Sequence, residues 1–467
     1  MKFYNTMTNQ VEEFKSIKPG FVKMYTCGPT VYNYAHIGNF RAYMFEDLLR
    51  RTLQFCSYRV LQVMNLTDVD DKTIRDSQKA SVSLQEYTEK FKKAFFEDLE
   101  LLNIEPAEQY PAATDHIPEM IDMIKILLEK GYAYCADDGC IYYSIEKFAD
   151  YGKLSGVDLQ EQRSSVRIKN DEYAKDAVAD FALWKAWDED DGDVFWNSPW
   201  GKGRPGWHIE CSAMSMKYLG KTFDIHTGGV DNIFPHHEDE IAQSEAANGK
   251  KFVNYWLHCG YLMAEGQKMS KSLGNFYTLA DLQKKGFSGR EIRWVLLGSH
   301  YRQQLNFTID GLKTARKTLF RIDGFTAKLK DISENAKVSE NTEVSKLTNE
   351  MQAEFTASLE NDLNMPKALG SLFEFIRKIN ILMNNKKVSA TNAQIILKSL
   401  EKLDMVIGCL DIQKEEEIPE EIKQLAKQRS EARKNKDYAE ADRLRDEIQS
   451  SGYELEDTPS GARIIAK

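Results

Sequence analysis

The sequence lacks any long apolar run. No stretch approaches the roughly 20 consecutive apolar residues that a membrane-spanning helix needs. The N-terminus, MKFYNTMTNQVEEF, has no apolar core and carries acidic residues, so it does not have the pattern of a secretory signal. These absences argue against a membrane protein and against a secreted one. We therefore expect a cytoplasmic protein.

Cysteine is scarce and scattered. An odd number of cysteines, seven in 467 residues, indicates a reducing compartment, where clustered cysteines are more often metal ligands than disulfide partners. Two of them flank the turn residues Asp138 and Gly139, and we interpret these two as paired strand positions of a hairpin. The seven positions are Cys27, Cys56, Cys135, Cys140, Cys211, Cys259 and Cys409.

The chain also lacks an excess of positive charge. Its net charge of −10 argues against a general nucleic-acid binder, but it does not exclude local basic surfaces. Residues 313–330 and residues 423–436 each carry six basic side chains and one acidic side chain. Each segment could contact phosphate or form a solvated helix face, and the sequence leaves both interpretations open.

Strand and helix patterns alternate in the first 115 residues and again after residue 200. Short apolar runs at 21–28 and 58–65 predict buried strands, and apolar residues at helical spacing follow Asn39. Further strands are predicted at 221–229 and 251–260, with helices at 207–220 and from Pro235. Helical patterns dominate from Thr278 onward. The sequence predicts an α/β sheet followed by helices, and ligands bind such sheets where strands lead into helices.

One group of residues has the chemistry of a metal site. His236, His237 and Glu240 lie in one helical stretch, where Glu240 can share a face with either histidine. Cys27 ends a predicted strand, and Cys211 lies on a predicted helix. Together they offer a Cys₂-His-Glu set of the kind that binds tetrahedral zinc. Two alternatives stay open, a surface helix with solvated charges and a rival ligand pair, His258-Cys259.

A second group suits phosphate. His36-Ile37-Gly38-Asn39 follows the first strand and begins a helix, whose N-terminus attracts anions. Lys268-Met269-Ser270-Lys271-Ser272 lies in a predicted loop with glycines on both sides. Its lysines and hydroxyls would stabilise charge that develops on phosphate. Alone, each motif is equally compatible with an ordinary helix start or an exposed basic loop.

The two motifs in this order resemble class I aminoacyl-tRNA synthetases, and within that class the cysteinyl-tRNA synthetase family. The resemblance covers nearly the whole chain, in the order expected for the family. Two positions depart from the expected pattern, Asn39 at the end of the first motif and Asn232. The matching stretches are FYNTMTNQVEEF, YTCGPTVYNYAHIGN, NLTDVDDKT, PGWHIECSAMS, GGVDNIFPHHEDEIAQSE, KMSKSLGN, YRQQLNFT, NDLNMPKALG, ARKNKDYAEADRLRDEI and LEDTPSG.

The resemblance implies a cysteine–tRNA ligase that activates L-cysteine with ATP and transfers it to tRNA(Cys). It also implies one Zn²⁺ per chain, which selects the substrate thiolate, and Mg²⁺ with the ATP. The implied zinc ligands are Cys27, Cys211, His236 and Glu240. The implied ATP-binding residues are His36, Gly38, Asn39, Lys268, Met269, Ser270 and Lys271, of which His36, Asn39, Lys268 and Lys271 are the implied catalytic residues. The implied cysteine-pocket residues are Gly28, Thr67, Trp207 and Asp231.

The resemblance further implies a Rossmann-like catalytic domain with an insertion, followed by helical domains in a monomeric protein. We expect the catalytic domain at 1–115 and 201–277, with a connective insertion at 116–200. The remaining expected regions are a helical stem-contact region at 278–330, a DALR-type bundle at 331–410 and a small anticodon-binding domain at 411–467.

Three rival functions also account for part of the sequence. A ligase that joins cysteine to an amino sugar would use the same adenylate and zinc but would not need the C-terminal segment. A zinc hydrolase using His236, His237 and Glu240 would leave KMSKS unexplained. A non-catalytic RNA-binding protein would not need intact HIGN and KMSKS motifs.

Overall fold

The computed structural model describes residues 1–157, 179–270, 273–335, 339–412, 419–458 and 461–466. The chain forms two compact units. Unit 1 comprises Met1–Ala315, Met351–Phe373 and Met405–Cys409, and unit 2 comprises Arg316–Glu350, Glu374–Asp404 and Leu410–Lys467. None of the described helices is both long enough and apolar enough to cross a membrane.

A four-stranded parallel sheet lies in unit 1 and confirms the predicted α/β fold. Its order is β11-β10-β3-β4, so the first strand of one half, β3, pairs with β10 of the other half. In sheets of this kind, ligands bind at the carboxyl ends of the strands where the order switches. The strands are β3 (Phe21–Thr26), β4 (Arg59–Met64), β10 (Phe223–Gly229) and β11 (Val253–Cys259).

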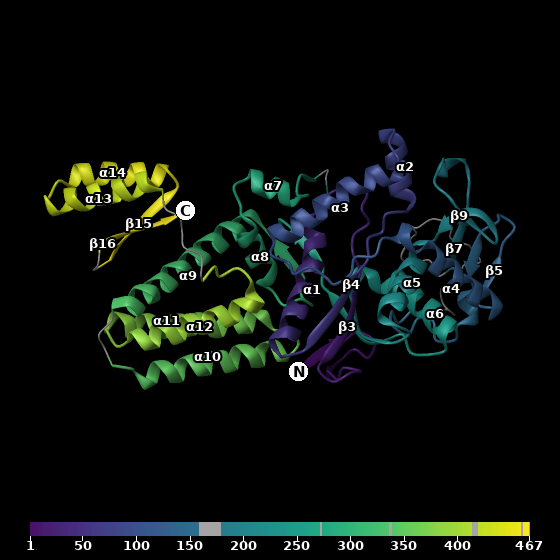
Figure 1. Cartoon of the computed structure of the whole chain (residues 1–467), viewed down its shortest axis with the longest axis horizontal. Helices are drawn as coiled ribbons and strands as arrows, with labels where there is room; N and C mark the ends of the chain where they lie inside the picture. Colours follow the sequence, from purple (N-terminus) through teal and green to yellow (C-terminus); the bar gives the residue numbers. More distant parts are fainter. Residues whose placement is uncertain (158–178, 271–272, 336–338, 413–418, 459–460, 467) are drawn as a thin grey trace. The chain divides into compact units, whose positions relative to one another are not determined.

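Helices pack on this sheet. Helix α1 packs against β4, and α5 packs against β3 (Figure 1). The Asp70 side chain accepts a hydrogen bond from Thr73 N and caps α2. The helices are α1 (Ile37–Phe55), α2 (Asp71–Ala80), α3 (Leu84–Leu101), α4 (Ile117–Glu129), α5 (Trp207–Leu219), α6 (Glu238–Asn248), α7 (Leu279–Lys284) and α8 (Gly289–Leu297).

A five-stranded antiparallel sheet, in the order β5-β6-β7-β9-β8, interrupts the parallel one in sequence. The predicted hairpin around Asp138-Gly139 is confirmed, but Cys135 pairs with Ile141 and Cys140 precedes β6, so the prediction that the two cysteines are paired strand positions was wrong. The sequence pattern does not predict β7, whose side chains are mostly buried. Residues 158–178 lie outside the described part. The strands are β5 (Ala133–Cys135), β6 (Ile141–Tyr143), β7 (Phe181–Ala186), β8 (Trp196–Ser198) and β9 (Gly201–Pro205).

The segment predicted as a loop around KMSKS also contains strands. Strand β12 pairs with β13 and with β14, so this part of the loop prediction was wrong. The sequence pattern does not predict these short strands, because β12 pairs with β14, whose residues lie about 40 positions further along the chain. The strands are β12 (Leu262–Ala264), β13 (Gln267–Lys268) and β14 (Leu305–Phe307), and a separate hairpin is formed by β1 (Lys2–Asn5) and β2 (Gln10–Glu13).

The C-terminal half is mainly helical, as predicted, but it ends in a two-stranded sheet. Helices α13 and α14 lie side by side and pack on this sheet around a small core of Ile422, Ala426 and Ile448 (Figure 1). The domain limits expected from the sequence stay predictions. The elements are α9 (Ile309–Asn335), α10 (Thr342–Glu360), α11 (Met365–Asn384), α12 (Ala390–Ile407), α13 (Glu420–Lys434), α14 (Tyr438–Ser450), β15 (Tyr453–Thr458) and β16 (Gly461–Ala466).

Candidate active site and metal centre

The HIGN tetrapeptide forms the N-terminus of α1. His36 Nδ1 accepts a hydrogen bond from Gly38 N at 3.1 Å, and Asn39 Oδ1 accepts one from His36 N at 3.0 Å. These reciprocal bonds form a capping box, in which asparagine at the fourth position of the motif supplies the return bond. The positive end of the helix dipole at this N-terminus favours a negatively charged ligand.

A cavity of about 280 Å³ opens beside this helix start, at the carboxyl ends of β3, β10 and β11. Seven predicted site residues line it: Cys27, Gly28, His36, Gly38, Asn39, Asp231 and Met269. Asn232, which departs from the family pattern, also lines it. The structure thus brings the strand end, the HIGN helix start and the start of the KMSKS segment to one cavity.

The KMSKS segment lies against the HIGN motif. A side-chain carbon added to Gly38 would overlap Cε of Met269 and lie 3.0 Å from the His36 ring. Just beyond the segment, Tyr277 O accepts a hydrogen bond from Ile37 N at 2.9 Å. Lys268 is exposed at the end of β13. The predicted residue Lys271 lies outside the described part of the chain.

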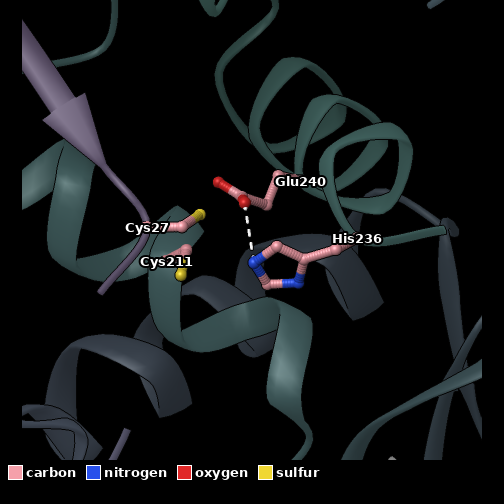
Figure 2. Close-up of side chains that lie close together, drawn as sticks. All are labelled: Cys27, Cys211, His236 and Glu240. Carbon is pink, nitrogen blue, oxygen red and sulfur yellow. Dashed lines mark ion pairs between the residues drawn. The ribbon is translucent and has the colours of Figure 1, made fainter. Parts of the chain in front are cut away.

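Four side chains from three elements and one turn form a candidate metal group. Cys27 follows β3, Cys211 lies on α5, His236 lies in a single π turn (Ile233–His237) and Glu240 lies on α6. Their ligand atoms lie within 4.8 Å of one another, and Figure 2 shows the four side chains close together, with the Glu240 carboxylate facing the His236 ring. Nε2 of His236 lies 3.0 Å from Oε1 of Glu240. This is the set that the resemblance implied.

The electrostatics of this group favour a bound cation. The hydrogen bond to Cys211, together with burial, raises the pKa of the Cys27 thiol well above its usual value. Burial opposes ionisation of Cys211, but the hydrogen bond from Cys27 and the proximity of His236 lower its pKa to about 6. Burial likewise opposes protonation of His236, but Glu240 and Cys211 raise its pKa to about 10. The group therefore concentrates negative charge that a proton on His236 partly balances.

A second set of ligand atoms overlaps the first. Cys27 and Glu240 also lie within 4.8 Å of ligand atoms of His226 and His237. Nε2 of His226 lies 3.0 Å from Oε2 of Glu240, and Nε2 of His237 lies 3.3 Å from Sγ of Cys27. The sequence left open which histidine joins Glu240, and by distance alone both sets qualify.

The rival ligand pair, His258-Cys259, belongs to neither set among the described residues. His258 contacts His237, with 2.8 Å between Nε2 of His258 and Nδ1 of His237. Sγ of Cys259 lies 3.6 Å from the backbone oxygen of Arg41. Cys259 also lines the cavity. These two side chains are therefore neighbours of the candidate metal group rather than members of it.

The four predicted cysteine-pocket residues take different positions. Gly28 and Asp231 line the cavity, and a side-chain carbon on Gly28 would overlap the backbone oxygen of Asn65. Thr67 is buried and donates to Oε2 of Glu210 at 2.9 Å. Trp207 stacks on His236 with ring centroids 4.3 Å apart. Thr67 and Trp207 are not among the residues that line the cavity, so their contact with cysteine stays a prediction.

Sequence reasoning assigned no role to several side chains around the metal group. Nδ1 of His208 lies 2.9 Å from Nδ1 of His236, and burial lowers the pKa of His208 well below its usual value. His226 is fully buried between Glu240 and the Trp256 ring, which stacks on it at 4.6 Å. Five of the chain's eight histidines gather here, and all five lie between residues 208 and 258, a concentration that is visible in the sequence. The five are His208, His226, His236, His237 and His258.

Solved structures resemble this fold. A methionyl-tRNA synthetase from Mycobacterium tuberculosis, solved with methionyl-adenylate, matches with a TM-score of 0.63 and 13% identity, over 83% of this chain and 92% of that chain. A leucyl-tRNA synthetase (LeuRS) from Agrobacterium radiobacter, solved in a ternary complex with tRNA, matches with a TM-score of 0.60 and 11% identity, over 86% and 87% of the two chains. The fold is that of the class I aminoacyl-tRNA synthetases.

Sequence comparison identifies the family. Residues 13–317 match the tRNA synthetases class I (C) catalytic domain, residues 354–411 a DALR domain and residues 415–463 the cysteinyl-tRNA ligase anticodon binding domain. The cysteine–tRNA ligase of Protochlamydia amoebophila is 51% identical, over 99% of this chain and 97% of the relative. That of Brachyspira hyodysenteriae is 52% identical, over 99% and 98%. The chain belongs to the cysteine–tRNA ligase family.

Family membership sets the reaction. The enzyme activates cysteine with ATP and transfers the cysteinyl group to tRNA, so its partners are an amino acid, ATP and tRNA. The match at 415–463 is to a tRNA-binding domain, which the rival amino-sugar ligase would not need.

Proposed function

We propose that the cavity beside α1 is where cysteine and ATP react, and that zinc held by Cys27, Cys211, His236 and Glu240 selects the substrate. One observation carries this proposal: Cys27 belongs to the four-ligand group and also lines the cavity that contains the HIGN helix start. A metal in that group would therefore adjoin the bound amino acid. The zinc would act as a selector and not as an activator of water.

The donor set fits zinc. Two cysteine sulfurs, one imidazole nitrogen and one carboxylate oxygen are its ordinary ligands, and all four ligand atoms lie within 4.8 Å of one another. When bound, zinc supplies a soft Lewis acid that prefers the thiolate of cysteine to the hydroxyl of serine. Shape alone discriminates poorly between such isosteres, by about a hundredfold. We assign the zinc to the set with Cys211 and His236, because Cys211 offers a second thiolate. In this assignment His226 contacts the ligand Glu240 and His237 contacts the ligand Cys27.

The adenylation step needs alignment and charge stabilisation and no protein nucleophile. A carboxylate oxygen of cysteine attacks the α-phosphorus of ATP, and pyrophosphate leaves. His36 and Asn39, at the positive end of α1, are placed at the cavity to face the phosphates, and Gly38 leaves room for the nucleotide. Lys268, Met269, Ser270 and Lys271 close over the triphosphate in this proposal, with Mg²⁺ bound to the ATP.

The transfer step moves the cysteinyl group to the terminal adenosine of tRNA(Cys). A ribose hydroxyl attacks the carbonyl carbon of the adenylate, and AMP leaves. In this proposal Gly28 and Asp231 at the cavity, together with Thr67 and Trp207, orient the cysteine during both steps. We place this reaction in the cytoplasm and in a monomer, because the chain carries its own tRNA-binding segments and a cysteine usage suited to a reducing compartment.

ATP–pyrophosphate exchange tests the proposal directly. Protein assayed for bound zinc is given cysteine or serine with ATP, and exchange is expected with cysteine alone, at about one zinc per chain. Exchange with both amino acids would contradict the role of the metal as selector. Exchange with neither would remove the adenylation step from this cavity. Hydrolytic activity without ATP would favour the rival hydrolase.

A further inference from the structure

Arg41 is a buried arginine on α1, two residues after the HIGN motif, and it lines the cavity beside that motif. Only 3% of its surface is exposed, and burial lowers the pKa of its guanidinium group. A buried cation is costly unless its charge is compensated. Among the described residues, its hydrogen-bond acceptors are all backbone oxygens. Peptide dipoles therefore compensate the charge in place of an acidic side chain.

The acceptors lie at the end of α8 and in the segment 298–304, which connects α8 to β14. Nη1 of Arg41 donates to Leu296 O at 2.5 Å, and Nη2 donates to His300 O at 2.8 Å and to Gln303 O at 3.3 Å. Leu296 lies in the last turn of α8, where the negative end of the helix dipole favours a cation. The planar fork of a guanidinium group can bond several separate oxygens at once, whereas an ammonium group is a single point charge. Arg41 thus joins the helix that begins with HIGN to the segment 298–304.

The segment 298–304 supports one wall of the cavity. Gly260 N donates to Tyr301 O at 2.8 Å, and a side-chain carbon on Gly260 would meet the backbone of this segment at 2.8 Å. Directly after the segment, Leu305 N donates to Tyr261 O at 3.0 Å. Gly260 and Tyr261 both line the cavity, so the position of this wall depends on the segment that Arg41 holds.

The same segment continues into the strands that lead to the KMSKS motif. Leu305 of β14 pairs with Leu262 of β12, and Met263 of β12 pairs with Lys268 of β13. The position of Lys268 relative to the HIGN helix start therefore depends on how the segment is fixed to α1. The four candidate metal ligands lie on other elements, and none of the Arg41 hydrogen bonds in the described part of the chain involves them.

We infer that Arg41 is a positioning residue for the activation of cysteine, and that it holds the cavity wall at Gly260 and the strands that carry Lys268 in place relative to the HIGN helix start. The inference deepens the proposed function and rests on it, because ATP is proposed to react in this cavity. It requires a selective effect: loss of Arg41 disturbs the reaction of ATP and leaves zinc and cysteine binding intact. A residue that only supported the fold would affect both.

Pyrophosphate exchange by the full-length enzyme tests this selectivity. Arg41→Ala is expected to lower kcat/KM for ATP about a hundredfold, because misplacement of reacting groups by about 1 Å has an effect of that size. The KM for cysteine should change less than about twofold, because the variant removes no contact of the metal group. Zinc content should stay that of the wild type. Arg41→Lys keeps the charge but loses the planar fork, so kcat/KM for ATP should still fall at least about tenfold.

Arg50→Ala is the matched control. Arg50 is a buried arginine of the same helix, but it pairs with Glu105 and Glu108 and does not line the cavity. Its loss removes a buried cation from α1 without freeing the segment 298–304. We expect kcat/KM for ATP in this variant to stay within about twofold of the wild type.

Rescue by a small cation gives a readout that a purely structural role would not change. Arg41 lines the cavity, so its replacement by alanine opens a space that small solutes can enter from the cavity. Guanidinium chloride, well below denaturing concentrations, should raise kcat/KM for ATP about tenfold in Arg41→Ala and leave Arg50→Ala unchanged. Ammonium chloride at the same concentration should have no effect, because ammonium has no planar fork.

Four results would overturn the inference. One is a wild-type kcat/KM for ATP in Arg41→Ala, and another is a wild-type value in Arg41→Lys, which would mean that the charge alone suffices. The third is a loss of zinc or of cysteine affinity in Arg41→Ala as large as the loss for ATP. The fourth is recovery with neither salt, or equal recovery with both. A wild-type enzyme without cysteine-dependent exchange would instead contradict the proposed function itself, and the inference with it.

Discussion

Met269 lies against Gly38, so that its terminal methyl group occupies the space that a side-chain carbon at position 38 would need. The two residues belong to the KMSKS segment and to the HIGN helix start, and both line the same cavity. The contact means that the space above the α1 N-terminus is shared between Met269 and any nucleotide that enters. Binding of ATP there would require the methionine to move.

Replacing Gly38 by alanine should therefore weaken ATP binding. The added methyl group meets Met269 and also lies 3.0 Å from the His36 ring, so it fills the floor of the cavity. We expect the KM for ATP in pyrophosphate exchange to rise at least about tenfold, which corresponds to a loss of about 1.4 kcal/mol. The KM for cysteine should change little.

Two further variants separate space for the nucleotide from a clash within the protein. If the clash with Met269 were the whole cause, Gly38→Ala combined with Met269→Ala would restore the KM for ATP. We expect no recovery, because the nucleotide itself needs the space. Gly370→Ala is the matched control, since a side-chain carbon at this glycine of α11 would meet nothing within 4 Å.

The metal group predicts which cysteines matter for metal content. Cys27→Ala should lose zinc, and Glu240→Ala should do the same, because each removes one of four ligands from a buried set. Cysteine binding should fall with the zinc while ATP binding survives. Metal content by mass spectrometry and binding by calorimetry check both outcomes, and unchanged cysteine affinity in a metal-free variant would contradict the role of the metal.

Cys259→Ala provides the comparison. Cys259 is as buried as Cys211 and lines the cavity, but its sulfur faces the backbone oxygen of Arg41. We expect this variant to keep about one zinc per chain. Loss of zinc in Cys259→Ala would instead support the rival ligand pair that the sequence left open.

Asp98 on α3 predicts a pH-dependent stability. Burial, with a smaller effect of Glu97, raises the pKa of its carboxyl group to about 7. In the unfolded chain an aspartate titrates near about 3.9, so between these values only the folded chain holds the proton. The free energy of unfolding therefore falls as the pH rises through this window.

Asp98→Asn removes this dependence. At pH 8 the variant should be more stable than the wild type by roughly 1 to 2 kcal/mol, a figure reduced for the partial exposure of the group. At pH 4 the difference should nearly vanish. Thermal unfolding at both pH values measures it, with Glu89→Gln on the exposed face of the same helix as the control. A stability gain that is equal at both pH values would contradict the titration.

The sequence predicted those features whose cause is local. The strand at 21–28 and the helix after it follow from apolar runs and from helical spacing, and His236 and Glu240 share a face because they are four residues apart. Contacts between residues far apart in the sequence leave no such local pattern. Nothing near His226 in sequence indicates that Glu240 would lie 3.0 Å away, and β7 was missed because its pairing with β6 and β9 depends on the whole sheet. The resemblance supplied the ligand set that spacing left open.

The C-terminal segment should be dispensable for adenylation. Helices α13 and α14 pack on their own sheet around Ile422, Ala426 and Ile448, apart from the cavity residues in sequence. Deleting residues 412–467 should therefore leave cysteine-dependent pyrophosphate exchange within about twofold and reduce tRNA charging much more. Equal losses of both activities would mean that the segment supports the fold of the rest of the chain.

Asn275 is a residue that sequence reasoning did not single out, and it holds the KMSKS segment. Its Oδ1 accepts a hydrogen bond from Ser270 N at 2.8 Å, and its Nδ2 donates to Ala264 O at 3.0 Å and to Lys268 O at 3.2 Å. The side chain is buried, so these three bonds fix the segment on both sides of Met269. Removing them takes one hydrogen bond from the buried Ala264 oxygen and one each from the more exposed Ser270 and Lys268, and such a bond contributes about 0.5 to 1.5 kcal/mol.

Asn275→Ala should therefore lower kcat for pyrophosphate exchange about tenfold or more, because the segment that carries Lys268, the lysine we propose to contact the triphosphate, is no longer held in place. Asn275→Asp keeps the oxygen that accepts from Ser270 but places a second carboxylate oxygen against the carbonyl oxygens of Ala264 and Lys268, which repel it, so its loss should be at least as large. Zinc content should stay at about one per chain in both variants, since the metal group lies on other elements. If Asn275→Ala instead lowered zinc content together with kcat, the residue would support the fold of the whole site, and the specific role in holding the segment would be wrong.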